Sequence, residues 1–241
     1  MGGAIIIPLY YLASLRLEYT KGYQPASRQI NLPYAKALLP ALFIGYLIPT
    51  ALLYLPSADP NLHTMQFFVA LWQVCPFFVN ILASGLSWAF GTNLKSESRG
   101  SSINGLRYLN RVYLVSFAVT ALLHIGTVLL FAWSSDPQLS FEHSFLISPI
   151  DKGSSYGMKM HRIFQFDFWI IFAAALLWTF YSFWELSYIA KSKISFPTSF
   201  AGIILATVCL GPAAAISGAW YLREQLLARE EGLQGVKSKR K

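Results

Sequence analysis

The chain has 241 residues, of which 55% are hydrophobic and 12% are charged, and its formal net charge is +8. With a mean hydropathy of +0.46, these values exclude a soluble domain, because a single core of this size cannot bury so many apolar residues. They predict an integral membrane protein, with lipid as the solvent for most of the chain and no nucleic-acid partner.

Six hydrophobic stretches are candidates for crossing the bilayer. A helix needs about 20 apolar residues to cross a hydrocarbon layer ~30 Å thick, and these stretches are too uniformly apolar for barrel strands. We expect helices over residues 3–17, 34–55, 65–90, 111–133, 167–188 and 198–222. The first is short. The sequence therefore predicts an all-α bundle of about six transmembrane helices, or seven, forming a single domain over residues 1–222, with a basic polar tail over residues 223–241.

Basic residues indicate how the helices are oriented. They cluster in two loops on the same expected side: Arg16, Lys21, Arg28 and Lys36, then Lys95, Arg99, Arg107 and Arg111. The positive-inside bias places these loops in the cytoplasm. Six simple crossings put the basic end, residues 237–241, on the opposite side, unless residues 139–150 form a re-entrant or interfacial element. The lysines at 237 and 239 have the spacing of a dilysine retrieval signal, which predicts the endoplasmic reticulum membrane, or they form a solvated tail near anionic headgroups.

Prolines and small residues are expected to shape the spans. Proline frees a backbone carbonyl and bends a helix, so we expect bends at Pro40, Pro49, Pro76 and Pro212. Small residues permit close helix contact, and three of them share one face of the last predicted helix: Gly211, Ala215 and Gly218. Bent helices with close contacts can enclose a cavity.

Polar side chains inside a bilayer are costly and mark candidate functional positions. Gln73 and Asn80 lie seven residues apart, hence on one face of the predicted third helix, where they serve either as hydrogen-bonding glue or as part of a site. His124 lies in the middle of the fourth stretch and is either structural or a proton shuttle. Asp167 is either a first-turn acid that complements its helix dipole or a desolvated Brønsted acid. Glu185 is either an interfacial charge near Lys191 and Lys193 or a direct participant.

Aromatic residues make up 16% of the chain and are not confined to the ends of the spans. Trp178, Phe180, Tyr181 and Phe183 lie close together in the fifth stretch. Ring faces beside a cavity stabilise positive charge by cation–π attraction, so such walls suit carbocation chemistry.

Several motifs together resemble those of fungal membrane-bound terpene cyclase-like proteins of meroterpenoid and indole-diterpenoid clusters. They are Ile7-Pro8-Leu9-Tyr10, Leu39-Pro40-Ala41, Gly45-Tyr46-Leu47-Ile48-Pro49-Thr50, Leu71-Trp72-Gln73, His124 and Gln165-Phe166-Asp167. The resemblance spans most of the chain, which is expected to lack N-terminal helices that longer relatives possess. It implies an enzyme that cyclises an isoprenoid or prenylated small molecule, epoxidised or not, by protonation.

The resemblance also implies roles for particular residues. Asp167 would donate the proton, and His124 and Gln73 would orient the acid or receive the final proton, with Glu185 as a further catalytic candidate. The expected cavity walls are Trp72, Tyr113, Trp169 and Trp178. No metal or other cofactor is implied, because protonation-initiated cyclisation needs none and aspartate-rich magnesium motifs are absent from the sequence.

A non-catalytic membrane protein is the alternative. Spans interrupted by proline also fit a transporter or a protein that assembles pathway enzymes at the membrane. The sequence lacks an evident inverted repeat and has few charged groups in its spans, which disfavours an ion-coupled carrier. The sequence leaves the oligomeric state open.

Overall fold

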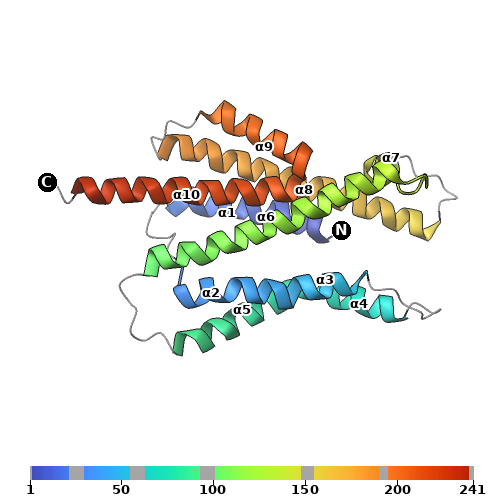
Figure 1. The fold of residues 1–241 in the computed structure, drawn as a ribbon, viewed down its shortest axis with the longest axis horizontal. Helices are drawn as coiled ribbons and strands as arrows, with labels where there is room; N and C mark the ends of the chain where they lie inside the picture. The colour runs from blue at the N-terminus through green and yellow to red at the C-terminus, as the bar shows by residue number, and fades with distance from the viewer. Residues whose placement is uncertain are drawn as a thin grey trace. The chain divides into compact units, whose positions relative to one another are not determined.

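A computed structural model of the chain describes residues 2–21, 30–54, 63–92, 101–147, 155–189 and 195–238. Every regular element in these ranges is a helix (Figure 1). The chain divides into two compact units, which are treated separately: one comprises Met1–Tyr23 with Tyr113–Lys241, and the other Gln24–Val112. The expected all-α membrane fold is confirmed, whereas the single domain over residues 1–222 and the separate tail over residues 223–241 stay predictions.

The unit Gln24–Val112 is built around a close pair of helices. Its elements are α2 (Leu32–Leu42), a π-helical turn (Phe43–Leu47), α3 (Ile48–Leu52), α4 (His63–Gln73) and α5 (Cys75–Thr92). The blue and green ribbons of α2 and α5 lie side by side in Figure 1. Gly45 allows the π-helical turn to approach α5 closely, because a Cβ there would lie 3.0 Å from the backbone nitrogen of Val79.

Prolines distort the spans of this unit as expected. The π-helical turn follows Pro40 and precedes Pro49, and α4 meets α5 at a bend of 55° just before Pro76. The predicted third span over residues 65–90 is therefore two helices. Gln73 and Asn80 lie on either side of the bend, so the expectation that they share one helix face is wrong.

The other unit contains the long helices. They are α1 (Gly2–Lys21), α6 (Ser101–Trp133), which enters this unit at Tyr113, α7 (Phe141–Phe145), α8 (Tyr156–Ile189), α9 (Phe196–Leu210) and α10 (Pro212–Ser238). The helices α6 and α8 thus begin earlier in the chain than the fourth and fifth predicted spans, at Ser101 and Tyr156. Within residues 139–150, the described part contains only the short helix α7, and residues 148–150 lie outside the described ranges.

Helices α9 and α10 replace the predicted last span over residues 198–222. Gly211 ends α9 with φ 90° and ψ 156°, a backbone conformation that is essentially restricted to glycine. Pro212 then starts α10, where its missing N–H is not needed. The chain reverses at this point, since Ser199 and Leu222 line the same cavity, and the orange and red helices lie side by side (Figure 1). The single-span prediction is therefore wrong.

Contacts between residues fix the helix directions in this unit. Residues 4 and 11 of α1 contact residues 167 and 178 of α8, so α1 and α8 run parallel. Residues 117 and 124 of α6 contact residues 218 and 211, so α6 runs antiparallel to α10. The ends of α1, α8 and α10, together with the beginning of α9, consequently lie at one end of the unit, which we call the basic end because Arg16 and Arg229 lie there.

Fewer spans are evident than the sequence predicts. Among the described residues, Leu32–Leu52, Gly105–Trp133 and Tyr156–Ser187 are long and apolar enough to cross a membrane, and the bent pair of α4 and α5 makes a fourth span if it counts as one. The apolar helices Gly3–Leu17 and Phe196–Leu210 are shorter. Many large apolar side chains are exposed on these helices, as expected for surfaces that face lipid.

Candidate functional site

An apolar cavity of about 710 Å³ lies between α6, α8, α9 and α10. Its volume is in the range of small-molecule sites, ~300–1,000 Å³. The walls combine a few aromatic rings with many small side chains. They are formed by Tyr113, Leu114, Phe117, Phe183, Ser195, Thr198, Ser199, Gly202, Ile203, Ala206, Ala214, Ala215, Gly218, Ala219, Tyr221 and Leu222.

Small residues create both the space and the contacts of this cavity. A Cβ at Gly202 would meet nothing within 4 Å, whereas a Cβ at Gly218 would lie 3.2 Å from the ring of Phe117. Ala214, Ala215 and Ala219 are buried. The expectation that small residues bring helices together holds for Gly218 and Ala215, while Gly211 forms the turn before the helix.

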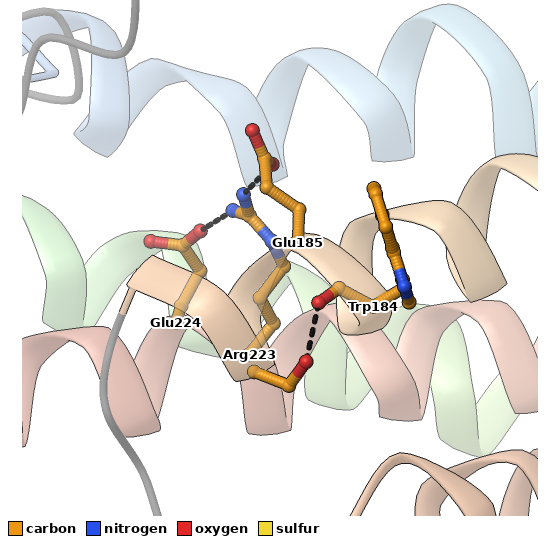
Figure 2. Close-up of polar contacts among 5 residues, drawn as sticks. Trp184, Glu185, Arg223 and Glu224 are labelled. Atoms are coloured by element: carbon orange, nitrogen blue, oxygen red, sulfur yellow. Dashed lines mark hydrogen bonds and ion pairs between the residues drawn. The ribbon is translucent and has the colours of Figure 1, made fainter.

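An ion cluster flanks the cavity toward the basic end. Figure 2 shows the Arg223 guanidinium of α10 between two carboxyl groups: Glu185 of α8 at 3.6 Å and Glu224 at 3.2 Å. The guanidinium carbon also lies 5.1 Å from the ring centroid of Trp220. Tyr113, which lines the cavity, is close enough to interact electrostatically with Glu224 and Arg223. The expected interfacial counter-ion of Glu185 is thus Arg223, while Lys191 and Lys193 lie outside the described ranges.

His124 lies against the turn that joins α9 and α10. Gly211 is buried, and a Cβ there would lie only 2.7–2.9 Å from three atoms of His124. His124 follows Phe117 by seven residues, so both lie on the same face of α6. The imidazole therefore packs on the turn that closes the α9–α10 hairpin. Arg223 lies 12 residues beyond this turn, or ~18 Å along α10.

Asp167 lies elsewhere in this unit. The Ala4 N–H donates to its Oδ1 at 3.2 Å, so the carboxyl group binds the first turn of α1, whose dipole favours a negative charge. Because α8 begins at Tyr156, the prediction that Asp167 occupies the first turn of its own helix is wrong. Phe183, which lines the cavity, lies 16 residues further along α8, or ~24 Å.

Residues around Asp167 hold the segment that joins α6 to α8. The buried Gln165 amide donates to the backbone oxygens of His143, Ser144 and Leu146 at 2.9–3.2 Å. The Trp169 indole N–H donates to the backbone oxygen of Phe145 at 2.8 Å. Trp169, predicted as a cavity wall, therefore anchors this segment.

The remaining predicted residues have separate surroundings. Trp178 stacks on Tyr11 of α1, with ring centroids 5.1 Å apart. Trp72 belongs to the other unit, where its indole N–H donates to Thr50 Oγ1 at 3.1 Å, and the exposed Gln73 follows it. Of the eight predicted site residues, Tyr113 lines the cavity. Glu185 lies two residues from the lining Phe183, and His124 lies seven residues from the lining Phe117 on the same face of α6. Roles for Trp72 and Gln73 stay predictions.

Sequence reasoning missed Arg223 and Glu224. Both lie just beyond the predicted last span, where charged residues are interpreted as part of a solvated tail. The available signal was Glu185 itself, because a carboxylate near the end of an apolar helix requires a partner. The partner comes from another helix, 38 residues along the chain, and no pattern within one segment identifies it.

Comparison with known proteins finds relatives that are named terpene cyclases and FAD-dependent monooxygenases. The terpene cyclase ascI of Acremonium egyptiacum is 27% identical over 74% of this chain and 47% of its own length. A terpene cyclase of Pyrenophora dematioidea is 25% identical over 93% of this chain and 61% of its own length. The FAD-dependent monooxygenase verC1 of Penicillium polonicum is 26% identical over 96% of this chain but only 28% of its own length.

This chain therefore spans between about a quarter and three fifths of these relatives. No solved structure matches it. The CtvD domain model matches residues 1–228, nearly the whole chain. The chain belongs to the CtvD-domain family.

Proposed function

We propose that the protein is a membrane-bound terpene cyclase-like enzyme that cyclises a prenyl-derived substrate by protonation in secondary metabolism. The observation that carries the proposal is the apolar cavity of about 710 Å³, which is flanked by the ion cluster of Arg223. Relatives with the name terpene cyclase support it. Small apolar walls accommodate an isoprenoid chain and exclude water, which would otherwise trap a carbocation.

The chemistry requires one proton donor and one proton acceptor. A proton added to an epoxide oxygen forms an O–H bond as a C–O bond breaks, and a proton added to a terminal alkene gives a cation directly. The π electrons of neighbouring alkenes then form C–C bonds, and loss of a proton from carbon restores neutrality. The product is an isomer of the substrate, so no oxidant or reductant is consumed.

His124 and the ion cluster of Arg223 are the candidates for the two proton transfers. His124 is our candidate for the first transfer, because an imidazole nitrogen can carry a proton to a substrate. The carboxyl groups of Glu185 and Glu224 share one guanidinium, so this cluster is our candidate for accepting the proton that is lost from carbon. The rings of Phe117 and Phe183 would stabilise the cation between them. The assignment of the first transfer to Asp167, from the family resemblance, stays a prediction.

We further propose that α9 and the first turns of α10 form a re-entrant hairpin. The 15 residues of α9 reach ~22 Å, less than the ~30 Å of the hydrocarbon layer. An irregular turn at membrane depth requires cover by protein, and Gly211 is buried against His124. With α1 and both arms of the hairpin, the described residues supply seven apolar segments in the membrane.

The hairpin returns α10 to the basic end, where Arg16 also lies. We propose that this end faces the cytosol and that the protein resides in the endoplasmic reticulum membrane. Tags at residue 241 and in the loop at residues 93–100 are expected to show equal protease sensitivity in sealed microsomes. Opposite protection of the two tags would contradict the hairpin.

A pathway assembly partner is the alternative function. One observation favours it: a stretch similar to this chain makes up about a quarter of the monooxygenase verC1. The same kind of domain thus occurs joined to further sequence in one chain. This alternative predicts that isolated, folded protein converts no prenylated substrate.

The cyclase proposal is tested by filling the cavity. Membranes with the protein are incubated with a farnesylated phenol and its terminal epoxide, and products are compared with those of empty membranes by chromatography and mass spectrometry. We expect a product of unchanged mass. Gly202→Leu should abolish formation of this product, because the added side chain projects into the cavity. Gly126→Leu is the matched control, since a Cβ at Gly126 also meets nothing within 4 Å but lies outside the cavity.

The outcomes are distinct. His124→Gln should also abolish conversion while the protein remains folded by size-exclusion chromatography. Equal product from Gly202→Leu and Gly126→Leu would refute the cavity as the reaction site. The absence of any product from folded wild-type protein would favour the assembly partner.

A further inference from the structure

A second, smaller pocket of about 330 Å³ continues the cavity toward the basic end. The two spaces share Phe183, Ser199, Tyr221 and Leu222 among their walls. They therefore form one site with an inner part, the apolar cavity, and an outer part, which we call the outer pocket.

The outer pocket differs from the cavity in chemistry. It adds Gln225, Leu226 and Arg229 of α10, so it offers an amide, a guanidinium and the hydroxyl groups of the shared walls. Arg229 is exposed and has no acidic partner among the residues that the structure describes. The carboxyl groups of Glu185 and Glu224 are already bound to Arg223.

We propose that the outer pocket binds an acidic head group of the prenylated substrate, with Arg229 and Gln225 as specificity-determining residues. A guanidinium presents donors in a planar fork that matches a carboxylate. The inference rests on the proposed function and narrows its substrate class to amphiphiles with an acidic head group. Such a molecule places its head at the basic end and its prenyl chain in the apolar cavity.

This orientation determines at which end of the cavity cyclisation of the prenyl chain begins. Arg229 lies 18 residues beyond Gly211, or ~27 Å along α10. The far end of the chain, where cyclisation starts, consequently points toward His124. The Glu185 and Glu224 carboxyl groups lie closer to the head, where the last cation forms and loses its proton.

The test uses one acidic probe and its neutral counterpart. The probes are 3-farnesyl-4-hydroxybenzoate, its methyl ester and the terminal epoxides of both. Binding to the full-length protein in nanodiscs of neutral lipid is measured by calorimetry, and conversion of the epoxides by chromatography. Arg229→Gln should weaken binding of the acid and raise the KM for its epoxide about tenfold, as expected for loss of a charge-assisted hydrogen bond. The kcat for the acid epoxide, and the binding and conversion of the ester, should stay unchanged.

The control is Arg107→Gln, which removes an exposed arginine of α6 outside both pockets. It should leave both probes unaffected. An equal loss for acid and ester in Arg229→Gln, or no loss for either, would overturn the head-group subsite even if cyclisation is observed. Selective loss of acid binding without any cyclisation would support the subsite and refute the proposed function.

Discussion

The conformation of Gly211 gives the sharpest test of the hairpin. Its φ of 90° and ψ of 156° lie in a region that costs a residue with a side chain about 1–3 kcal/mol. In Gly211→Ala the new methyl group would also lie 2.7 Å from Cγ of His124, well inside van der Waals contact. Both effects act on the same turn, and neither arises if α9 and α10 form one continuous helix.

We expect Gly211→Ala to lower the unfolding midpoint of the detergent-purified protein. At ~2–4 °C per kcal/mol for a chain of this size, the backbone term alone corresponds to a fall of roughly 2–12 °C. The double variant Gly211→Ala/His124→Ala should recover part of this loss, because it removes the steric contact but not the backbone strain. Tryptophan fluorescence during heating gives the midpoints.

The matched control is Gly126→Ala on α6, where a Cβ meets nothing within 4 Å. A helical glycine replaced by alanine gains about 0.5–1 kcal/mol, so this midpoint should stay unchanged or rise. A Gly211→Ala midpoint equal to that of the wild type would refute the turn. A double variant no more stable than Gly211→Ala would refute its contact with His124.

Two further predictions concern the charged groups. Asp167→Asn keeps an oxygen for the Ala4 N–H but loses the charge beside the α1 dipole. We therefore expect product formation to continue and the free energy of unfolding to fall by about 0.3–1 kcal/mol. Loss of all product in folded protein would instead assign the first proton transfer to Asp167. Arg223→Met leaves two carboxylates facing each other and should destabilise the protein by about 1–3 kcal/mol, whereas adding Glu185→Gln and Glu224→Gln should restore the midpoint. Failure of that restoration would contradict the ion cluster.

The sequence predicts the helical membrane fold because its signal is local. Each apolar stretch is read within about 20 residues, and the structure has helices in every predicted stretch. The distortion near Pro76 was also predictable, since proline acts on its own helix. The degree of the bend, 55°, was not, because it depends on the helices packed around it.

The last predicted span shows where local reading is insufficient. Gly211 and Pro212 are a strong turn signal, but the residues on both sides are apolar, and hydropathy alone joins them into one stretch. The Ala4–Asp167 hydrogen bond joins residues 163 positions apart, and the Arg223–Glu185 ion pair joins residues 38 positions apart. Such pairs follow from tertiary packing, so the types of candidate residue were predictable but their partners were not.

The hairpin connects the cavity, the ion cluster and the charge distribution of the chain. If α10 continued the direction of α9, Arg223 would lie ~18 Å beyond Gly211, away from the beginning of α9. Because the chain reverses, Arg223 returns to Glu185 near the end of α8, and the space between the two arms becomes the cavity. The same reversal brings the basic residues of α10 to the end of the unit where Arg16 lies. A single glycine with positive φ therefore accounts both for the cavity wall that α9 and α10 form and for the return of α10 to the basic end.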